Sequence, residues 1–334
     1  MTAARPIELP CPSCGRPAEL RDSFCEACGA ALEPVAASDG QHAATAAGAP
    51  CPSCGTGLIG ADGFCGACGQ KAPAGRDHAE LDLGLVAGVS DRGLRHPRNE
   101  DALALAVTRD AEGPVAIAVV CDGISSADRA DDASLAAARA AAQQLAVAIP
   151  AGTSPVDASV QAAQAARDAV ETLAGPGAES PAATFISAVL TRGTVTLCWL
   201  GDSRGYWLDA HPRPVDQQLT RDDSLATELV ERGELSPADA LSAPEAHVVT
   251  RWIGTDDDDL DPHVVQFAPP GPGVLLLCSD GLWNYAPEAG KLAALAMPGA
   301  VTDPPGAATA LVQFALDAGG MDNVTVALAP FPLA

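Results

Sequence analysis

Short acidic motifs recur at the ends of apolar stretches, and their residue types suit hard cations. Five acidic strand ends without lysine partners would repel one another unless a divalent cation neutralised them, although a single Asp-Gly is usually only a turn. Oxygen ligands select Mg²⁺ or Mn²⁺, and a two-metal acidic centre with a bridging hydroxide is suited to phosphoester hydrolysis. The motifs are Asn99-Glu100-Asp101, Cys121-Asp122-Gly123, Gly201-Asp202-Ser203-Arg204, Ser279-Asp280-Gly281-Leu282-Trp283 and Asp322-Asn323.

Eight of the eleven cysteines lie before residue 70, in two copies of one pattern. In each copy, two thiolate pairs are spaced so that four sulfurs can surround one Zn²⁺ as a tetrahedron. Neither copy is long enough to bury a core without a metal, so the zinc would be structural. A disulfide framework is the alternative, but the chain shows no export signal and disulfides are rare in the cytosol. The predicted zinc ligands are Cys11, Cys14, Cys25 and Cys28, followed by Cys51, Cys54, Cys65 and Cys68.

Each cysteine module resembles a short zinc ribbon, and the pair resembles a double zinc ribbon, which implies two Zn²⁺ per chain. Some ribbons bind DNA, but residues 11–69 contain only two basic residues, Arg16 and Arg21. The whole chain has 19 Lys and Arg against 43 Asp and Glu, a formal net charge of −24. Nucleic acid binding needs clustered basic side chains that displace counterions from phosphates. The ribbons are therefore predicted to dock a protein, with no nucleic acid partner.

The pattern of apolar residues predicts the strands and helices that could position the acidic motifs. Two Ala-rich segments at 131–149 and 155–174 predict long helices, and shorter helices are expected at 224–232 and 306–316. Paired strands followed by paired helices favour an α+β fold with antiparallel sheets over a parallel sheet. The predicted strands are 83–89, 102–107, 115–121, 185–190, 194–200, 264–267, 274–278 and 324–328.

Composition divides the chain into two small modules and one large domain. No apolar run approaches the roughly 18 residues that span a bilayer, and no export signal is visible. We therefore expect a cytoplasmic protein without a membrane partner. The predicted parts are zinc ribbon 1 at 9–32, a linker at 33–50, zinc ribbon 2 at 51–70, a linker at 71–82 and the large domain at 83–330.

Residues 83–329 resemble the metal-dependent protein phosphatase family of type 2C, because its motifs occur here in order. The resemblance implies a sandwich of two antiparallel sheets flanked by paired antiparallel helices, with two small N-terminal zinc ribbons ahead of it. It also implies hydrolysis of phosphoserine and phosphothreonine in proteins by a water bridged between two Mg²⁺ or Mn²⁺ ions. Residues 220–241 resemble the mobile flap beside the family's site. The matching motifs are 99–101, 122–123, Ala183-Thr184, 201–204, 279–283 and 322–323.

Carried over by position, the resemblance implies a role for each acidic residue. Asp122 would bridge both metals, and the Gly123 carbonyl and a water held by Glu100 would complete one of them. Asp280 and Asp322 would hold the other metal. The implied catalytic carboxylates are therefore Asp122, Asp280 and Asp322.

Other positions of this chain either support these metal ligands or differ from the family's motifs. Asp101 would support the metal ligands from behind, and Asp202 matches a residue that helps hold a more weakly bound third metal. Asn284 replaces a carboxylate common in relatives, which weakens that third site. Where relatives place a phosphate-gripping Arg, this chain has His96 with Arg95 beside it, so these two are the phosphate-binding candidates. The changed clamp leaves open a pseudophosphatase that binds phosphoproteins without hydrolysing them.

Overall fold

The structure of this chain is a computed structural model. Two predicted zinc ligands, Cys11 and Cys14, and the acidic run at 256–259 lie outside the described residues. The described residues are 8–10, 16–19, 25–28, 35–37, 48–51, 54–61, 63–69, 75–127, 129–174, 180–211, 215–240, 243, 245, 248–254 and 260–333.

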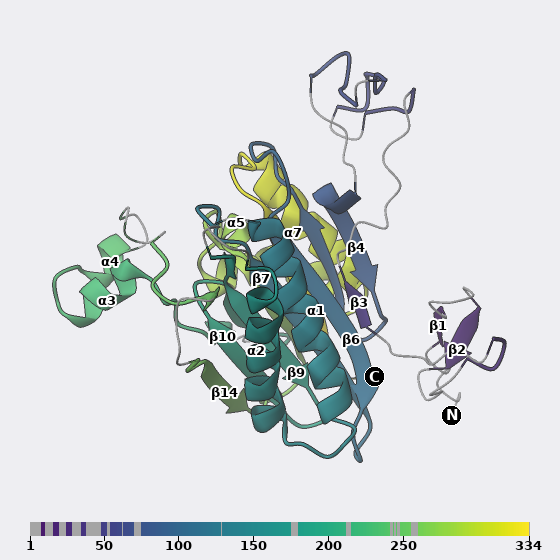
Figure 1. Ribbon diagram of the computed structural model, residues 1–334, viewed down its shortest axis with the longest axis vertical. Coiled ribbons are helices and arrows are strands. Elements are labelled where there is room, and N and C mark those ends of the chain that lie inside the picture. Colours follow the sequence, from purple (N-terminus) through teal and green to yellow (C-terminus); the bar gives the residue numbers. More distant parts are fainter. Residues whose placement is uncertain are drawn as a thin grey trace.

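Two six-stranded sheets, with antiparallel pairing throughout, form a sandwich (Figure 1). The first sheet has the order β14-β10-β9-β7-β6-β3, and the second has the order β12-β11-β15-β16-β5-β4. The first contains β3 (Val35–Ala37), β6 (Asp101–Arg109), β7 (Pro114–Asp122), β9 (Phe185–Leu190), β10 (Val195–Leu200) and β14 (His263–Phe267). The second contains β4 (His78–Asp82), β5 (Ala87–Asp91), β11 (Arg204–Asp209), β12 (Gln217–Gln218), β15 (Gly273–Cys278) and β16 (Val324–Phe331).

Helices cover both outer faces of the sandwich, which confirms the predicted fold class. Helices α1 (Ala130–Ala148) and α2 (Pro155–Glu171) pack on the first sheet, and α6 (Ala289–Ala300) and α7 (Pro304–Asp317) pack on the second. Ser154 caps α2 by accepting from the Asp157 amide at 3.1 Å, with Pro155 in the first turn. Among the helices that the structure describes, none is long and apolar enough to cross a membrane.

Strand β6 shows why the first sheet is buried on both faces. Its small side chains at 102, 104 and 106, all Ala, belong to the core shared with α1 and α2. Its larger side chains, Leu103, Leu105 and Val107, belong to the core between the two sheets. Successive side chains on a strand point to opposite faces, so one continuous apolar run supplies two cores. The small residues let the helices approach the sheet closely.

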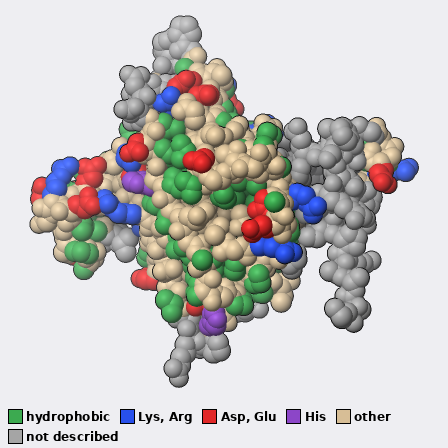
Figure 2. Space-filling model, turned by 90° about the horizontal axis from the view of Figure 1, so that it is seen from below, with side chains coloured by type: hydrophobic (Ala, Val, Ile, Leu, Met, Phe, Trp, Pro, Cys, Tyr) green, Lys and Arg blue, Asp and Glu red, His purple; other side chains and the backbone are tan. Residues whose placement is uncertain are grey.

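Five short elements complete the fold around the strand ends. Helices α3 and α4 protrude from the sandwich at the left of Figure 1, and Figure 2 shows acidic and basic side chains mixed on this projection. Ion pairs there join Arg221 to Glu231 at 2.6 Å and Arg232 to Glu228 at 2.8 Å. The elements are α3 (Leu225–Glu231), α4 (Pro237–Ala240), α5 (Asp280–Trp283) and the paired strands β8 (Ala182–Ala183) and β13 (Ile253–Gly254). A separate hairpin pairs β1 (Glu8–Pro10) with β2 (Pro17–Glu19).

Both predicted linkers contain strands of the sandwich, and this corrects the sequence-based boundaries. Strand β3, from the linker predicted at 33–50, pairs with β6 and forms one edge of the first sheet. The linker predicted at 71–82 contains the 3₁₀ turn η1 (Gly75–Asp77) and β4, which pairs with β5. Backbone pairing at a sheet edge needs no long apolar run, so composition did not reveal it. We propose that the large domain includes residues 75–82 together with the strand at 35–37.

Arg76 in η1 is also part of the large domain. Its guanidinium donates to the Asp131 carbonyl at 2.6 Å and to the Asp101 carbonyl at 3.4 Å. Its own carbonyl accepts from the Asn99 side-chain amide at 3.0 Å. The chain between zinc ribbon 2 and the sandwich is therefore bonded directly to the Asn99-Glu100-Asp101 motif.

We expect a fragment comprising residues 83–334 to melt at a temperature about 5 °C or more below that of a fragment comprising 75–334. The shorter fragment lacks the β4 ladder and the Arg76 hydrogen bonds, each worth about 1 kcal/mol. Thermal unfolding followed by circular dichroism measures the difference. Equal melting temperatures would show that residues 75–82 are dispensable.

Candidate metal centres

Four carboxylates line one cavity of about 1010 Å³ at the strand ends. Asp122 ends β7, Asp202 lies in the turn between β10 and β11, Asp280 begins α5 after β15, and Asp322 precedes β16. Gly123 lines the same cavity. The structure thus brings together five of the seven residues predicted to bind Mg²⁺ or Mn²⁺.

The other two predicted residues, Glu100 and Asp101, do not line the cavity. Asp101 pairs with Asp122 in the β6–β7 ladder, is buried, and accepts from the Ser279 hydroxyl at 2.7 Å. The Glu100 carboxylate accepts from Arg98 Nε at 3.1 Å and from the Ser125 hydroxyl at 2.6 Å. Asp101 therefore lies behind the cavity, as the resemblance implied, and Glu100 is held by two neighbours at its side.

Burial and mutual repulsion disfavour the charged forms of these carboxyls. Burial first, and then neighbouring carboxylates, raise the pKa values of Asp122 and Asp280 well above the usual range. The same two causes raise the pKa of Asp202 to about 7, while burial raises that of Asp101 to about 6. One buried oxygen each of Asp101 and Asp280 has no hydrogen-bond partner. A divalent cation would neutralise the carboxylates and would coordinate the oxygens that lack a hydrogen-bond partner. The residues present therefore fit Mg²⁺ or Mn²⁺.

Two polar side chains fix the backbone beneath the carboxylates. Thr184 donates its amide to the Asp122 carbonyl at 2.7 Å, and its hydroxyl accepts from the Asp122 amide at 3.0 Å. The Thr184 hydroxyl also lies 2.9 Å from that of Ser203. The Asn323 side chain accepts from the Glu100 amide at 2.7 Å. The Ala-Thr and Asp-Asn motifs thus position their acidic neighbours.

Arg204 supports the site from below, a role that the sequence did not reveal. It is buried, and its guanidinium binds the Asp222 carboxylate through Nε at 2.9 Å and through Nη2 at 2.6 Å. The same guanidinium stacks 3.7 Å from the ring centroid of Trp283. Trp283 in turn donates its indole N–H to the Asp202 carbonyl at 2.9 Å. This chain of contacts joins the base of the flap to one of the cavity carboxylates.

Neither phosphate-binding candidate lines the cavity. His96 Nε2 lies 3.1 Å from Asp322 Oδ1, so it contacts the cavity wall from outside. Arg95 is exposed. Asn284 does line the cavity, and its side-chain amide donates to Asp280 Oδ2 at 3.2 Å.

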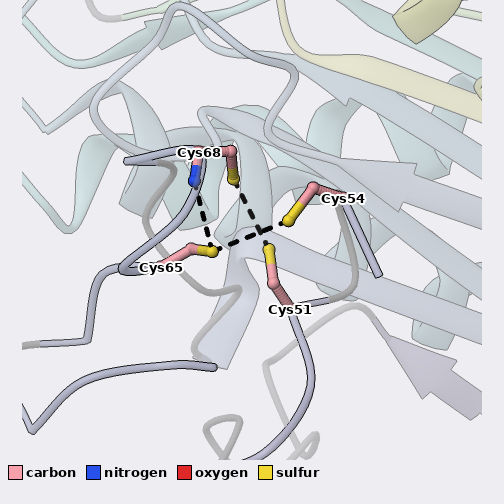
Figure 3. A group of neighbouring side chains, drawn as sticks. All are labelled: Cys51, Cys54, Cys65 and Cys68. Carbon is pink, nitrogen blue, oxygen red and sulfur yellow. Dashed lines mark hydrogen bonds between the residues drawn. The ribbon is translucent and has the colours of Figure 1, made fainter. Parts of the chain in front are cut away.

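The cysteines of ribbon 2 converge on one point (Figure 3). The ligand atoms of Cys51, Cys54, Cys65 and Cys68 all lie within 4.8 Å of one another. Two sulfur–sulfur distances, from Cys51 to Cys68 and from Cys54 to Cys65, are 3.7 Å. Four thiolates at about 2.3 Å from one tetrahedral ion would stand about 3.8 Å apart. The arrangement therefore fits Zn²⁺ as predicted.

Local backbone geometry prepares this cluster for a cation. Amides of Ala67 and Cys68 point at Cys65 Sγ from 3.4 and 3.5 Å and lower the pKa of that thiol. The pKa of Cys54 falls to about 6, chiefly because the Thr56 hydroxyl donates to its sulfur. At Gly57, a Cβ would lie 2.4 Å from Cys65 Sγ. Only glycine fits there.

The fold and the two clusters together define a two-sheet sandwich with a carboxylate-lined cavity and a thiolate-rich N-terminal module. A family model described as protein phosphatase 2C matches residues 93–214, and one described as a double zinc ribbon matches residues 11–69. The large domain therefore resembles the protein phosphatase 2C family, and the segment ahead of it resembles a double zinc ribbon.

Relatives extend this similarity over most of the large domain. The serine/threonine phosphatase stp of Listeria monocytogenes is 36% identical over 146 residues, which are 43% of this chain and 55% of that protein. The chain thus spans about half the length of that relative. The structure of the PPM Ser-Thr phosphatase MsPP from Mycobacterium smegmatis, in complex with cacodylate, gives a TM-score of 0.58 at 28% identity, covering 75% of this chain and 98% of that one. The PstP catalytic domain in complex with two manganese ions gives 0.54 at 25% identity, covering 73% and 97%.

We expect Gly57→Ala to reduce the zinc content by one ion per chain, because its methyl group would displace Cys65 Sγ. Metal analysis of the purified protein measures this. Gly66→Ala is the matched control, since a Cβ there meets only the Leu58 carbonyl oxygen, at 3.9 Å. Equal zinc content in Gly57→Ala and the wild type would contradict the proposed packing.

In chelator, Asp202→Asn should raise the melting temperature at pH 8 by about 4 °C. The pKa of Asp202 in the folded protein is about 7, above its ordinary value of 3.8. Between these two pH values the folded state keeps a proton that the unfolded state has lost, so stability falls as the pH rises to about 7 and stays lower above it. Asn carries no charge, so its advantage at pH 8 should shrink towards pH 5.

The control for this measurement is Asp168→Asn, on the exposed face of α2. Chelation removes zinc equally from all three proteins, so the comparison isolates the substituted carboxyl. An Asp202→Asn protein no more stable than the wild type at pH 8 would be evidence against strong repulsion at this position.

Proposed function

We propose that this protein is a metal-dependent serine/threonine protein phosphatase, a phosphoric monoester hydrolase. The observation that carries the proposal is the set of four carboxylates around one cavity, three of them buried or half-buried with raised pKa values. Such a set is costly to a fold unless cations neutralise it, and a phosphate monoester is a ligand that bound cations attract. The names of the relatives support the same reaction.

Two Mg²⁺ or Mn²⁺ ions would be held by Asp122 together with Gly123, Asp280 and Asp322. When bound, these ions would lower the pKa of water to supply a nucleophile and would neutralise charge on the phosphate. Asp122 has the central place because both its backbone groups are fixed by Thr184. No cysteine nucleophile is needed.

The remaining polar residues would orient the reacting groups. Arg98 and Ser125 hold the Glu100 carboxylate in one orientation, from which it can position a water at the cavity edge. His96 Nε2 lies 3.1 Å from Asp322 Oδ1 and would orient that carboxylate. Asp202 would help hold a weaker third ion, and the neutral Asn284 beside it provides less attraction than a carboxylate.

The zinc ribbons would act as a docking module for a protein partner, each holding one structural Zn²⁺. Their few basic residues disfavour nucleic acid, and the phosphatase domain would meet phosphoserine or phosphothreonine proteins. We place the protein in the cytoplasm, as a signalling enzyme. A pseudophosphatase remains the second candidate because of His96 and Arg95, but the complete set of cavity carboxylates favours an active enzyme.

We expect Asp122→Ala to reduce Mn²⁺-dependent hydrolysis of p-nitrophenyl phosphate to less than about a tenth of the wild-type rate, because the change removes the central ligand. Asp168→Asn should retain full activity. Chelator should abolish the wild-type rate, and excess Mn²⁺ should restore it. A wild-type protein without hydrolysis, but with affinity for phosphopeptides, would favour the pseudophosphatase.

A further inference from the structure

Beyond the carboxylates, one wall of the 1010 Å³ cavity is apolar. This wall is formed by the segment that returns from the flap into the sandwich, together with residues next to Gly123. Val248 is 47% exposed although it is a large hydrophobic residue, and Trp252 is half-buried. The wall consists of Ile124, Ala182, Val248, Val249 and Trp252.

The returning segment is fixed at the flap side. The Leu225 amide donates to the Val248 carbonyl at 2.9 Å, and the Thr250 amide donates to the Asp223 carbonyl at 2.9 Å. Val249 forms a β-bridge with Ser224, the residue that caps α3. These backbone bonds fix the segment that carries Val248, so its side chain already lines the cavity in this structure.

The same segment is tied to the metal-binding residues at its other end. Strand β13 pairs with β8, and Ala183 of β8 bridges Gly123. The Ala182 carbonyl accepts from the Ile124 amide at 3.0 Å. Trp252 lies over this small sheet, since a Cβ at Gly254 would meet the indole at 3.0 Å. The apolar wall thus stands at a fixed place relative to Asp122-Gly123.

The charges around the cavity decide which substrate residues can use this wall. All charged side chains among the described lining residues are aspartates, and no Lys or Arg is among them. An acidic residue beside the phosphorylated one would therefore find no basic side chain to pair with, and it would lose its hydration against the apolar wall. An apolar residue would be removed from water against Trp252 and Val248.

We propose that Trp252 and Val248 form a specificity subsite for an apolar side chain flanking the phosphorylated residue of a phosphopeptide substrate. The inference rests on the proposed phosphatase function, because it places the phosphate at the carboxylates of the same cavity. Contact of one such side chain with a preformed apolar pocket discriminates by about 10-fold or more in kcat/KM.

The test uses the full-length protein with Mn²⁺ and a set of phosphothreonine peptides. The peptides differ at one position only, which carries Leu, Ser or Asp. This position is varied in turn among the two residues before and the two residues after the phosphothreonine. We expect Leu to exceed Ser by about 10-fold in kcat/KM at one position, and Asp to be the poorest there. The readout is the Leu-to-Ser ratio, so changes in overall rate cancel.

Variants then assign the preference to the wall. Trp252→Ala and Val248→Ser should each lower the Leu-to-Ser ratio to about 3-fold or less. Val160→Ser is the matched control, because Val160 is 41% exposed on α2, outside the residues that line the cavity. It should keep the wild-type ratio. If Trp252→Ala does not fold, Val248→Ser decides alone, since an exposed Val can be replaced without loss of core packing.

The outcomes separate this inference from the proposed function. A wild-type protein that hydrolyses none of the peptides contradicts the phosphatase function itself. Hydrolysis at equal rates for Leu, Ser and Asp overturns only the subsite. A preference for Leu that survives in both variants also overturns it, because the discriminating residues would then lie elsewhere.

Discussion

Mutual repulsion among the carboxyls of Asp101, Asp122, Asp202 and Asp280 is the constraint on which this structure depends. Asp101 and Asp202 are buried and Asp122 and Asp280 are half-buried, and burial together with their neighbours' charges raises their pKa values. Repelling groups on flexible segments would move apart. Here they lie at the ends of strands paired within two sheets, where a shift of one residue would turn every side chain to the opposite face. The sheets therefore hold the carboxyls together, and the repulsion is relieved either by bound protons or by bound cations.

Much of this arrangement can be predicted from sequence, because apolar runs and acidic strand ends are local signals. Strand β9 was predicted with its observed bounds, and the fold class is confirmed. Helix α6 was missed because Gly290, Pro298 and Gly299 interrupt its pattern. Strand β11 was missed because its Arg204 reads as a surface charge, whereas in the fold it is buried against Asp222. The Arg204–Asp222 ion pair joins residues 18 positions apart, so a local sequence pattern does not predict it.

The flap is attached to the site by two consecutive acidic residues that face different partners. Asp222 binds the guanidinium of Arg204, while Asp223 accepts from the Gly201 amide at 2.9 Å and lies 2.8 Å from His263 Nε2. Both connections end on the turn that carries Asp202. A change in the position of the flap base would therefore move a cavity carboxylate. The buried Arg204–Asp222 pair also makes such a movement costly, because separating it would leave a charge without a partner in a dry environment.

The protein shifts the pKa values of the ligands in opposite directions at the two candidate metal centres. In ribbon 2, amide and hydroxyl donors lower the pKa values of Cys54 and Cys65, which favours thiolates before any metal binds. Around the cavity, burial raises the pKa values of the carboxyls, and few donors compensate their charge. Soft thiolates select zinc, and hard carboxylates select magnesium or manganese. One acidic chain can therefore keep the two kinds of ion apart by ligand chemistry. Without metal, repulsion at the carboxylate site destabilises the fold. The stability of the large domain should therefore increase with the Mg²⁺ or Mn²⁺ concentration.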